Sequence, residues 1–180
     1  MGDREAEHTS PVPCLDQKIA GNQDNTTGGY KFGVFTNDKV EFEIRTSANA
    51  GTLIRTTAGG TVLTPGVWYH VAGIYSQGNY IRTYVNGVLD REMITTAILG
   101  TSTGSLKIGC EPFTPTSGLF NGLVDEVQIY KTALSPSQVA WLAGYTSVLS
   151  IPADLHQDNV IDFKDFAVLA DSWLEVILWP

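Results

Sequence analysis

The chain has 180 residues, of which 43% are hydrophobic and 17% charged, and its formal net charge is −8 at pH 7. This length and composition predict one folded domain with room for a small appendage, and they exclude a disordered chain. The acidic balance and the lack of clustered Lys and Arg argue against nucleic acid as a partner. No apolar run is long enough to cross a bilayer, so membrane insertion is not expected.

The first part of the chain is polar and carries few structural signals. Residues 1–17 contain Pro11 and Pro13, which predicts a disordered or loosely attached arm. The first residues also lack the basic and then apolar layout of a secretory signal peptide.

Two strands are predicted between residues 30 and 45, joined by a turn at residues 36–38. The second strand alternates, with Val40, Phe42 and Ile44 on one face and Glu41, Glu43 and Arg45 on the other. We expect the first face in the core and the second in water. Short Thr-rich strands follow over residues 52–57 and 61–63.

The central stretch predicts further strands and a hairpin. Residues 67–75 are an unbroken β-branched and aromatic run, which favours a strand buried on both faces. Residues 80–85 alternate, and Asn86-Gly87 is a strong signal for a two-residue hairpin turn because both positions need positive φ. Residues 105–109 and 119–130 predict two more strands.

A short helix is predicted after the last strand. Ser135 suits the N-cap, Pro136 the first helical position and Gln138 the third residue of a capping box. Val139 begins an apolar stripe, and Gly144 is typical of a helix end.

Five sequence landmarks recur in a recognisable order. They are Trp68-Tyr-His-Val-Ala72, Tyr84-Val-Asn-Gly87, Leu106-Lys-Ile-Gly109, Phe120-Asn-Gly-Leu-Val-Asp-Glu-Val-Gln-Ile-Tyr130 and Ala133-Leu-Ser135. Together they resemble the laminin-G-like jelly-roll domain of the concanavalin A-like lectin and glucanase superfamily. The resemblance implies an all-β, antiparallel β-sandwich over residues 18–146.

The resemblance also implies an N-terminally incomplete domain. Such domains open with two strands that are not visible here, and residues 17–20 stand in only for the end of the second one. We therefore expect unpaired sheet edges, which invite a strand from a partner.

The C-terminal part, residues 147–180, contains a linker and a candidate calcium loop. Acidic residues occupy positions one, five, nine and twelve of residues 154–165, and position seven offers a backbone carbonyl. The predicted ligands are Asp154, His156, Asp158, Val160, Asp162 and Asp165. The residues that follow repeat apolar side chains at helical spacing, which predicts an amphipathic helix.

This loop and helix resemble a single dockerin repeat. His156 replaces the usual Asn or Asp at position three, and Asn159 replaces the usual Gly at position six, so we expect weakened calcium binding. The alternative is a decayed loop that only caps its helix. A dockerin that binds cohesin has two repeats, so a cohesin-like partner is not favoured here.

Several side chains are candidates for catalysis or metal binding. Glu41 and Glu43 are within reach of a glycosidase pair, but the glucanase motif is absent, and a solvated face with Arg45 as countercharge is preferred. His70 fits a hydrogen-bonded core residue better than a catalyst. For Asp125, the resemblance implies a structural or calcium-linked role, and solvent exposure or pairing is the alternative.

Glycan contact and disulfide formation are further candidates. Tyr75, Tyr80, Tyr84 and Trp141 have rings on which sugars stack, although a core position is the alternative for each. Cys14 and Cys110 can pair in an oxidising compartment or remain free thiols.

These observations and the resemblance predict a non-catalytic carbohydrate-binding or adhesion module of a secreted or cell-surface bacterial protein. Its expected partner is a polysaccharide, another glycan or an extracellular protein, and its expected cofactor is calcium at a weakened site. A glycoside hydrolase of the same fold and a purely structural, protein-binding domain are the alternatives.

Overall fold

The computed structural model describes residues 6–8, 16–24, 26–35, 37–47, 51–56, 60–144, 163, 164 and 167. The chain divides into two units, Met1–Tyr145 and Thr146–Pro180. The first unit contains the strands and the helix described below. Within the described residues, no helix has the length and apolar character required to span a bilayer.

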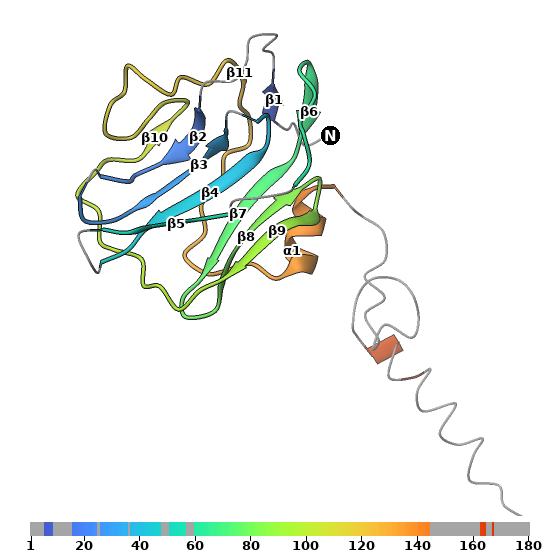
Figure 1. Cartoon of the computed structure of the whole chain (residues 1–180). Coiled ribbons are helices and arrows are strands. Elements are labelled where there is room, and N and C mark those ends of the chain that lie inside the picture. Colours follow the sequence, from blue (N-terminus) through green and yellow to red (C-terminus); the bar gives the residue numbers. More distant parts are fainter. Residues whose placement is uncertain are drawn as a thin grey trace, which may run out of the picture. The chain divides into compact units, whose positions relative to one another are not determined.

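Antiparallel strands form three sheets in the described part of the chain (Figure 1). The large sheet, in the order β10-β2-β3-β4-β5, contains β2 (Gln17–Gly21), β3 (Tyr30–Val34), β4 (Val40–Arg45), β5 (Leu53–Arg55) and β10 (Lys107–Ile108). The meander sheet contains β7 (Val71–Ser76), β8 (Tyr80–Val85) and β9 (Val88–Ile94). The small sheet joins β1 (Ala6–His8), β6 (Val67–Tyr69) and β11 (Gly122–Leu123).

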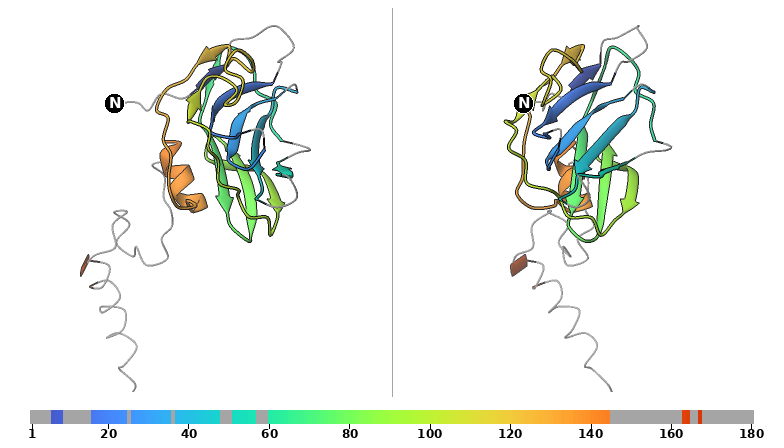
Figure 2. Two further views of the ribbon diagram at one scale, coloured as in Figure 1. Left: turned by 90° about the vertical axis from the view of Figure 1, so that its left-hand side faces the viewer. Right: turned by 60° about the vertical axis from the view of Figure 1, so that its left-hand side comes forward.

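The core lies between the large sheet and the meander sheet. Val40 of β4 packs in one cluster with Val85 of β8, and Ile44 packs in a second cluster with Ile81. Both β4 side chains are fully buried, as the alternation predicted. The two sheets form the layers of an antiparallel β-sandwich, which confirms the predicted fold class (Figure 2).

Helix α1 (Pro136–Leu142) covers the other face of the meander sheet, where Val139 is buried in a cluster with Ile74. Its start confirms the predicted capping box. The Gln138 backbone N–H donates to Ser135 Oγ at 3.2 Å, and the Ser135 N–H donates to Gln138 Oε1 at 2.8 Å. These bonds satisfy two donors that every helix start leaves open.

The predicted hairpin is confirmed, but the predicted unbroken strand over residues 67–75 is wrong. Asn86 and Gly87 have φ of 47° and 73° and connect β8 to β9. The run before the hairpin breaks at His70, because β6 pairs with β1 and β7 pairs with β8. It is not buried on both faces either, since Ile74 is its only fully buried residue.

The predicted strand over residues 119–130 is also shorter than expected, because β11 covers only Gly122–Leu123. Among the described residues, no backbone group forms a hydrogen bond with the backbone of residues 125–134. Glu126 adopts a left-handed φ of 49°, which interrupts extended backbone.

Strand β1 lies within the arm that was predicted to be loosely attached. Ala6–His8 pairs with β6 on one side and with β11 on the other, so this part of the arm belongs to a sheet. Gln17, at the end of the predicted arm, begins β2.

Candidate functional site

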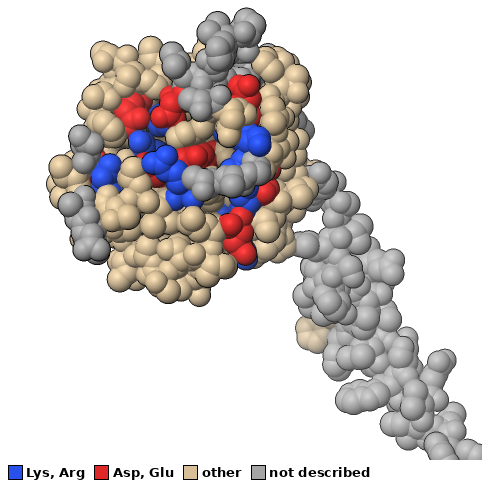
Figure 3. Space-filling model, viewed as in Figure 1, with Lys and Arg blue, Asp and Glu red and all other residues tan. Residues whose placement is uncertain are grey.

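A layer of charged side chains lies on the face of the large sheet that is turned away from the core. We call Lys18, Lys31, Glu41, Glu43 and Arg55 the polar face. Strand register places Glu43 directly between Lys31 of β3 and Arg55 of β5. Figure 3 shows positive and negative side chains interleaved over this sheet. Neighbouring strands therefore place opposite charges side by side.

Glu43 is the centre of the polar face and is only 1% exposed. Its Oε1 accepts a hydrogen bond from Gln23 Nε2 at 2.9 Å and lies 3.3 Å from Lys31 Nζ. Its Oε2 lies 3.0 Å from the guanidinium of Arg55. The predicted wet face is thus wrong at Glu43, because its three polar neighbours replace water around the carboxylate.

Glu41 shares the Arg55 guanidinium, whose Nε lies 3.7 Å from Glu41 Oε1. Burial raises the pKa of Glu41 to about 7; Arg55 opposes this shift and the charge of Glu43 adds to it. A glycosidase needs two carboxyl groups that reach the substrate. Glu43 is enclosed by its partners, so this pair does not present two such groups.

Lys18 closes one end of the polar face. Its ammonium group pairs with Asp16 and lies 3.8 Å from the centre of the Phe35 ring. Burial lowers the pKa of Lys18, whereas the bond to Asp16 acts in the opposite direction. The salt bridge and the ring contact stabilise a lysine that is shielded from water.

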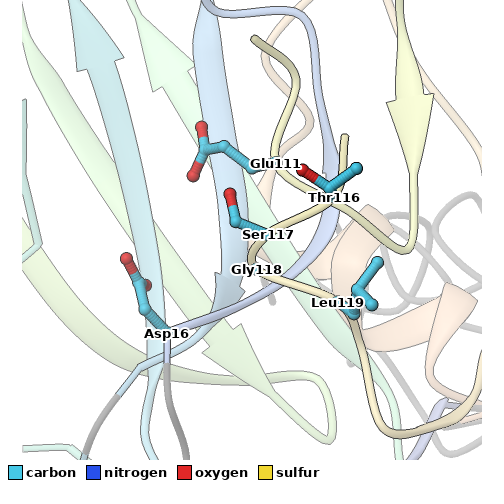
Figure 4. A pocket seen from close by; sticks show the side chains of 6 residues that line it. All are labelled: Asp16, Glu111, Thr116, Ser117, Gly118 and Leu119. Atoms are coloured by element: carbon cyan, nitrogen blue, oxygen red, sulfur yellow. The ribbon is translucent and has the colours of Figure 1, made fainter. Parts of the chain in front are cut away.

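A pocket of roughly 480 Å³ opens beside the polar face (Figure 4). It is lined by Asp16, Glu111, Thr116, Ser117, Gly118 and Leu119. Figure 4 shows that Asp16 comes from the approach to β2, and that the other lining residues belong to the loop after β10.

Backbone hydrogen bonds hold this loop on β2. The Lys18 N–H of β2 donates to the Gly118 carbonyl of the loop at 2.9 Å. Within the loop, the Glu111 N–H donates to the Ser117 carbonyl at 3.0 Å. Gly118 has a φ of 57°, and a Cβ there would lie 3.2 Å from the Asp16 carbonyl oxygen. A glycine suits both this backbone conformation and the close approach.

Lys31 connects the pocket to the polar face. Its Nζ lies 3.5 Å from Glu111 Oε1 as well as close to Glu43, and it faces the Phe113 ring at 5.4 Å. Glu111 is 7% exposed, and its Oε1 is buried with Lys31 as its ion-pair partner. The pocket thus offers carboxylate and hydroxyl oxygens next to the apolar Leu119, which suits a ligand with hydroxyl groups and a C–H face.

No sequence motif indicated this pocket. Asp16 and Glu111 are far apart along the chain and come together only through the pairing of β10 with β2. A usable signal was the run of turn-forming residues after β10, which contains Pro112, Pro115 and Gly118.

The predicted calcium ligands Asp154, His156, Asp158, Val160, Asp162 and Asp165 lie outside the described residues. Asp125 is described and is exposed, and its Oδ1 accepts a hydrogen bond from the Glu126 N–H at 2.9 Å. Within the part of the chain that the structure describes, no three His, Cys, Asp or Glu side chains gather in a way that suits a metal ion.

His70 lies where the chain passes from β6 to β7. Its N–H donates to Asn86 Oδ1 at 3.0 Å, and its carbonyl accepts from the Asn86 N–H at 2.7 Å. Burial lowers the pKa of the His70 imidazole. These bonds belong to the His70 backbone; the residue is half-buried, and its Nδ1 has no hydrogen-bond partner among the described residues.

The aromatic candidates have different environments. Tyr84 is buried, the Tyr75 hydroxyl donates to the Ala97 carbonyl, and the Tyr80 ring stacks with Arg82. Trp141 on α1 is 67% exposed and is the most open ring of the group. Of the two cysteines, Cys110 has a free thiol, and Cys14 lies outside the described residues.

The antiparallel sandwich with one polar, pocketed face defines a β-sandwich protein of the jelly-roll class. A model of the concanavalin A-like lectin/glucanases superfamily matches residues 8–140, and the chain belongs to this superfamily. This confirms the family that the sequence landmarks indicated.

Two solved structures share the fold. The CBM40 of the Ruminococcus gnavus IT-sialidase has a TM-score of 0.58 and 16% identity, covering 78% of this chain and 80% of that chain. The native heptameric SAP-like pentraxin from Limulus polyphemus has a TM-score of 0.53 and 20% identity, covering 78% of this chain and 66% of that chain. The match thus spans just under two thirds of the pentraxin. A search of curated proteins gave no match.

Proposed function

We propose that this chain is a non-catalytic glycan-binding module, and that the pocket of Asp16, Glu111 and Ser117 holds the sugar. The observation that carries the proposal is the pocket of roughly 480 Å³, in which the Asp16 and Glu111 carboxylates and the Ser117 hydroxyl lie beside the apolar Leu119. Sugar hydroxyl groups can donate to carboxylate oxygens, and the C–H face of a sugar suits an apolar side chain. Membership of the lectin and glucanase superfamily and the likeness to the CBM40 fold support the same conclusion.

Secretion or display at the cell surface is part of this proposal, because such modules meet polysaccharides outside the cell. Calcium binding by residues 154–165 is also part of it, and calorimetry of the chain with calcium tests that point separately. Binding to an extracellular protein is the competing outcome.

The glycan proposal is tested by calorimetry with a panel of soluble plant and algal polysaccharides. Thr116→Trp fills the pocket mouth from an exposed loop position, and we expect it to weaken binding at least about tenfold, as the loss of one well-placed ligand contact does. Thr96→Trp introduces the same side chain at an exposed position outside the pocket lining and should bind like the parent chain.

Two results would overturn the proposal. One is a panel in which no glycan binds, and the other is full binding by Thr116→Trp. Chain shortening of a bound polysaccharide during the titration would instead support the glycoside hydrolase alternative.

A further inference from the structure

The segment that leads from β11 to α1 is exposed to solvent. We call residues 125–131 the open segment; every one of these residues is exposed, and its backbone is free of turns and bends except at the left-handed Glu126 and at Lys131, where it bends. No described residue forms a backbone hydrogen bond with it. Val127 and Ile129, at alternate positions, are 40% and 56% exposed. A segment without a described backbone partner and with alternating apolar side chains becomes a template for another strand once its backbone extends.

We propose that a second copy of this chain supplies that strand, and that two open segments pair antiparallel about a two-fold axis at Gln128. In this register Gln128 lies opposite its own equivalent. Asp125 of each copy lies opposite Lys131 of the other, and Val127 lies opposite Ile129. Because the interface is isologous, the Asp125–Lys131 pair and the Val127–Ile129 pair each form twice.

The argument for this occupant is complementarity of charge and shape. Opposite charges and aliphatic pairs that face each other across strands are stabilising, each by about 0.2–1 kcal/mol. A register centred on Val127 or on Ile129 places a charged side chain opposite an aliphatic one. The register at Gln128 is therefore the one in which both kinds of pair are matched.

Pairing also changes the conformation of Glu126. In the free chain Glu126 has a φ of 49°, and its N–H is bonded to the side chain of Asp125. A left-handed conformation is unfavourable for a residue with a Cβ. Extension of Glu126 in the paired strand relieves it and releases the Asp125 carboxylate toward Lys131.

Sedimentation equilibrium of the full chain is the first test, and we expect a reversible monomer–dimer equilibrium. Asp125→Lys sets two positive charges opposite each other in both charged pairs, so the dissociation constant should rise about tenfold. The double variant Asp125→Lys/Lys131→Asp should restore the parent affinity. Glu92→Lys makes the same charge change at an exposed position of β9 and should leave the equilibrium unchanged.

Cross-linking tests the register in a background with Cys14→Ser and Cys110→Ser. Gln128→Cys places two thiols opposite each other at a strand separation of about 5 Å between Cα atoms, within reach of a disulfide. Lys131→Cys lies about 20 Å from its equivalent and should not cross-link. A monomer at every concentration, a dimer that ignores the charge variants, or equal cross-linking at both positions would each overturn the proposal.

Discussion

Strand β4 and the open segment have the same kind of alternating sequence and opposite environments. Val40 and Ile44 of β4 are 0% exposed, and their strand is bonded to β3 on one side and β5 on the other. Val127 and Ile129 are 40% and 56% exposed, and no described strand lies beside them. Alternation thus decides which face a side chain takes, whereas neighbouring strands decide whether that face is buried.

Acidic side chains show the same contrast. Glu43 is buried because Lys31 and Arg55 stand beside it on adjacent strands. Asp125 is exposed and, among the described residues, accepts a hydrogen bond from the next residue along the chain. A carboxylate in a strand is therefore buried when the neighbouring strands carry its partners.

The largest expected effect comes from truncating an isoleucine in each region. Ile44→Ala should lower the free energy of unfolding by about 4 kcal/mol, because it leaves a cavity in the core. Ile129→Ala should lower it by less than about 0.5 kcal/mol in the dilute monomer. Urea unfolding followed by circular dichroism measures both. Equal losses would show that Ile129 is packed like Ile44 and would contradict the difference between the two regions.

A smaller difference is expected for the acids. Glu43→Gln leaves Lys31 and Arg55 around a neutral amide and should lower the free energy of unfolding by about 3 kcal/mol. This value is at the low end for the loss of one partner of a buried ion pair, because Arg55 can reach water. Asp125→Asn should change the stability by less than about 0.5 kcal/mol. Thermal unfolding of the two variants at low salt provides the measurement, and a Glu43→Gln chain as stable as the parent contradicts the buried network.

The smallest effect is a pH dependence that belongs to Glu41. Its pKa is raised from its usual 4.5 to about 7, so the folded chain holds the proton more tightly than the unfolded chain. The stabilisation is fully present below about pH 4.5 and is lost as the pH rises through 7. Water near the carboxyl group reduces the change to about 1–2 kcal/mol.

A neutral side chain isolates this pH effect. Glu41→Gln cannot titrate. The unfolding free energy of the parent chain minus that of this variant should therefore decrease as the pH rises from 4.5 to 8. Urea titrations across that range provide the measurement, and a constant difference would mean that Glu41 ionises normally.

Features with a local physical cause could be predicted from the sequence. Asn86-Gly87 requires only positive φ at two positions, and the Ser135 capping box requires only residues three apart. The two faces of β4 follow from a period of two. The family could be predicted as well, because its landmarks keep their order along the chain.

Features that depend on distant segments could not be predicted. The break at His70 follows from the pairing of β6 with β1, which local composition does not signal. Burial of Glu43 depends on the register of three strands. The pocket depends on a loop after β10 that folds back over the approach to β2. In each case the deciding partner lies far along the chain.

Asn86 at the hairpin tip has a second consequence. Its side chain accepts a hydrogen bond from the His70 N–H, and its backbone N–H donates to the His70 carbonyl. His70 is the residue at which the chain passes from the small sheet to the meander sheet. A turn that forms from neighbouring residues is thereby coupled to the crossing between two sheets. An ordered hairpin tip therefore restricts the conformations of the chain that follows it. Fewer arrangements of the distant strands then have to be sampled during folding.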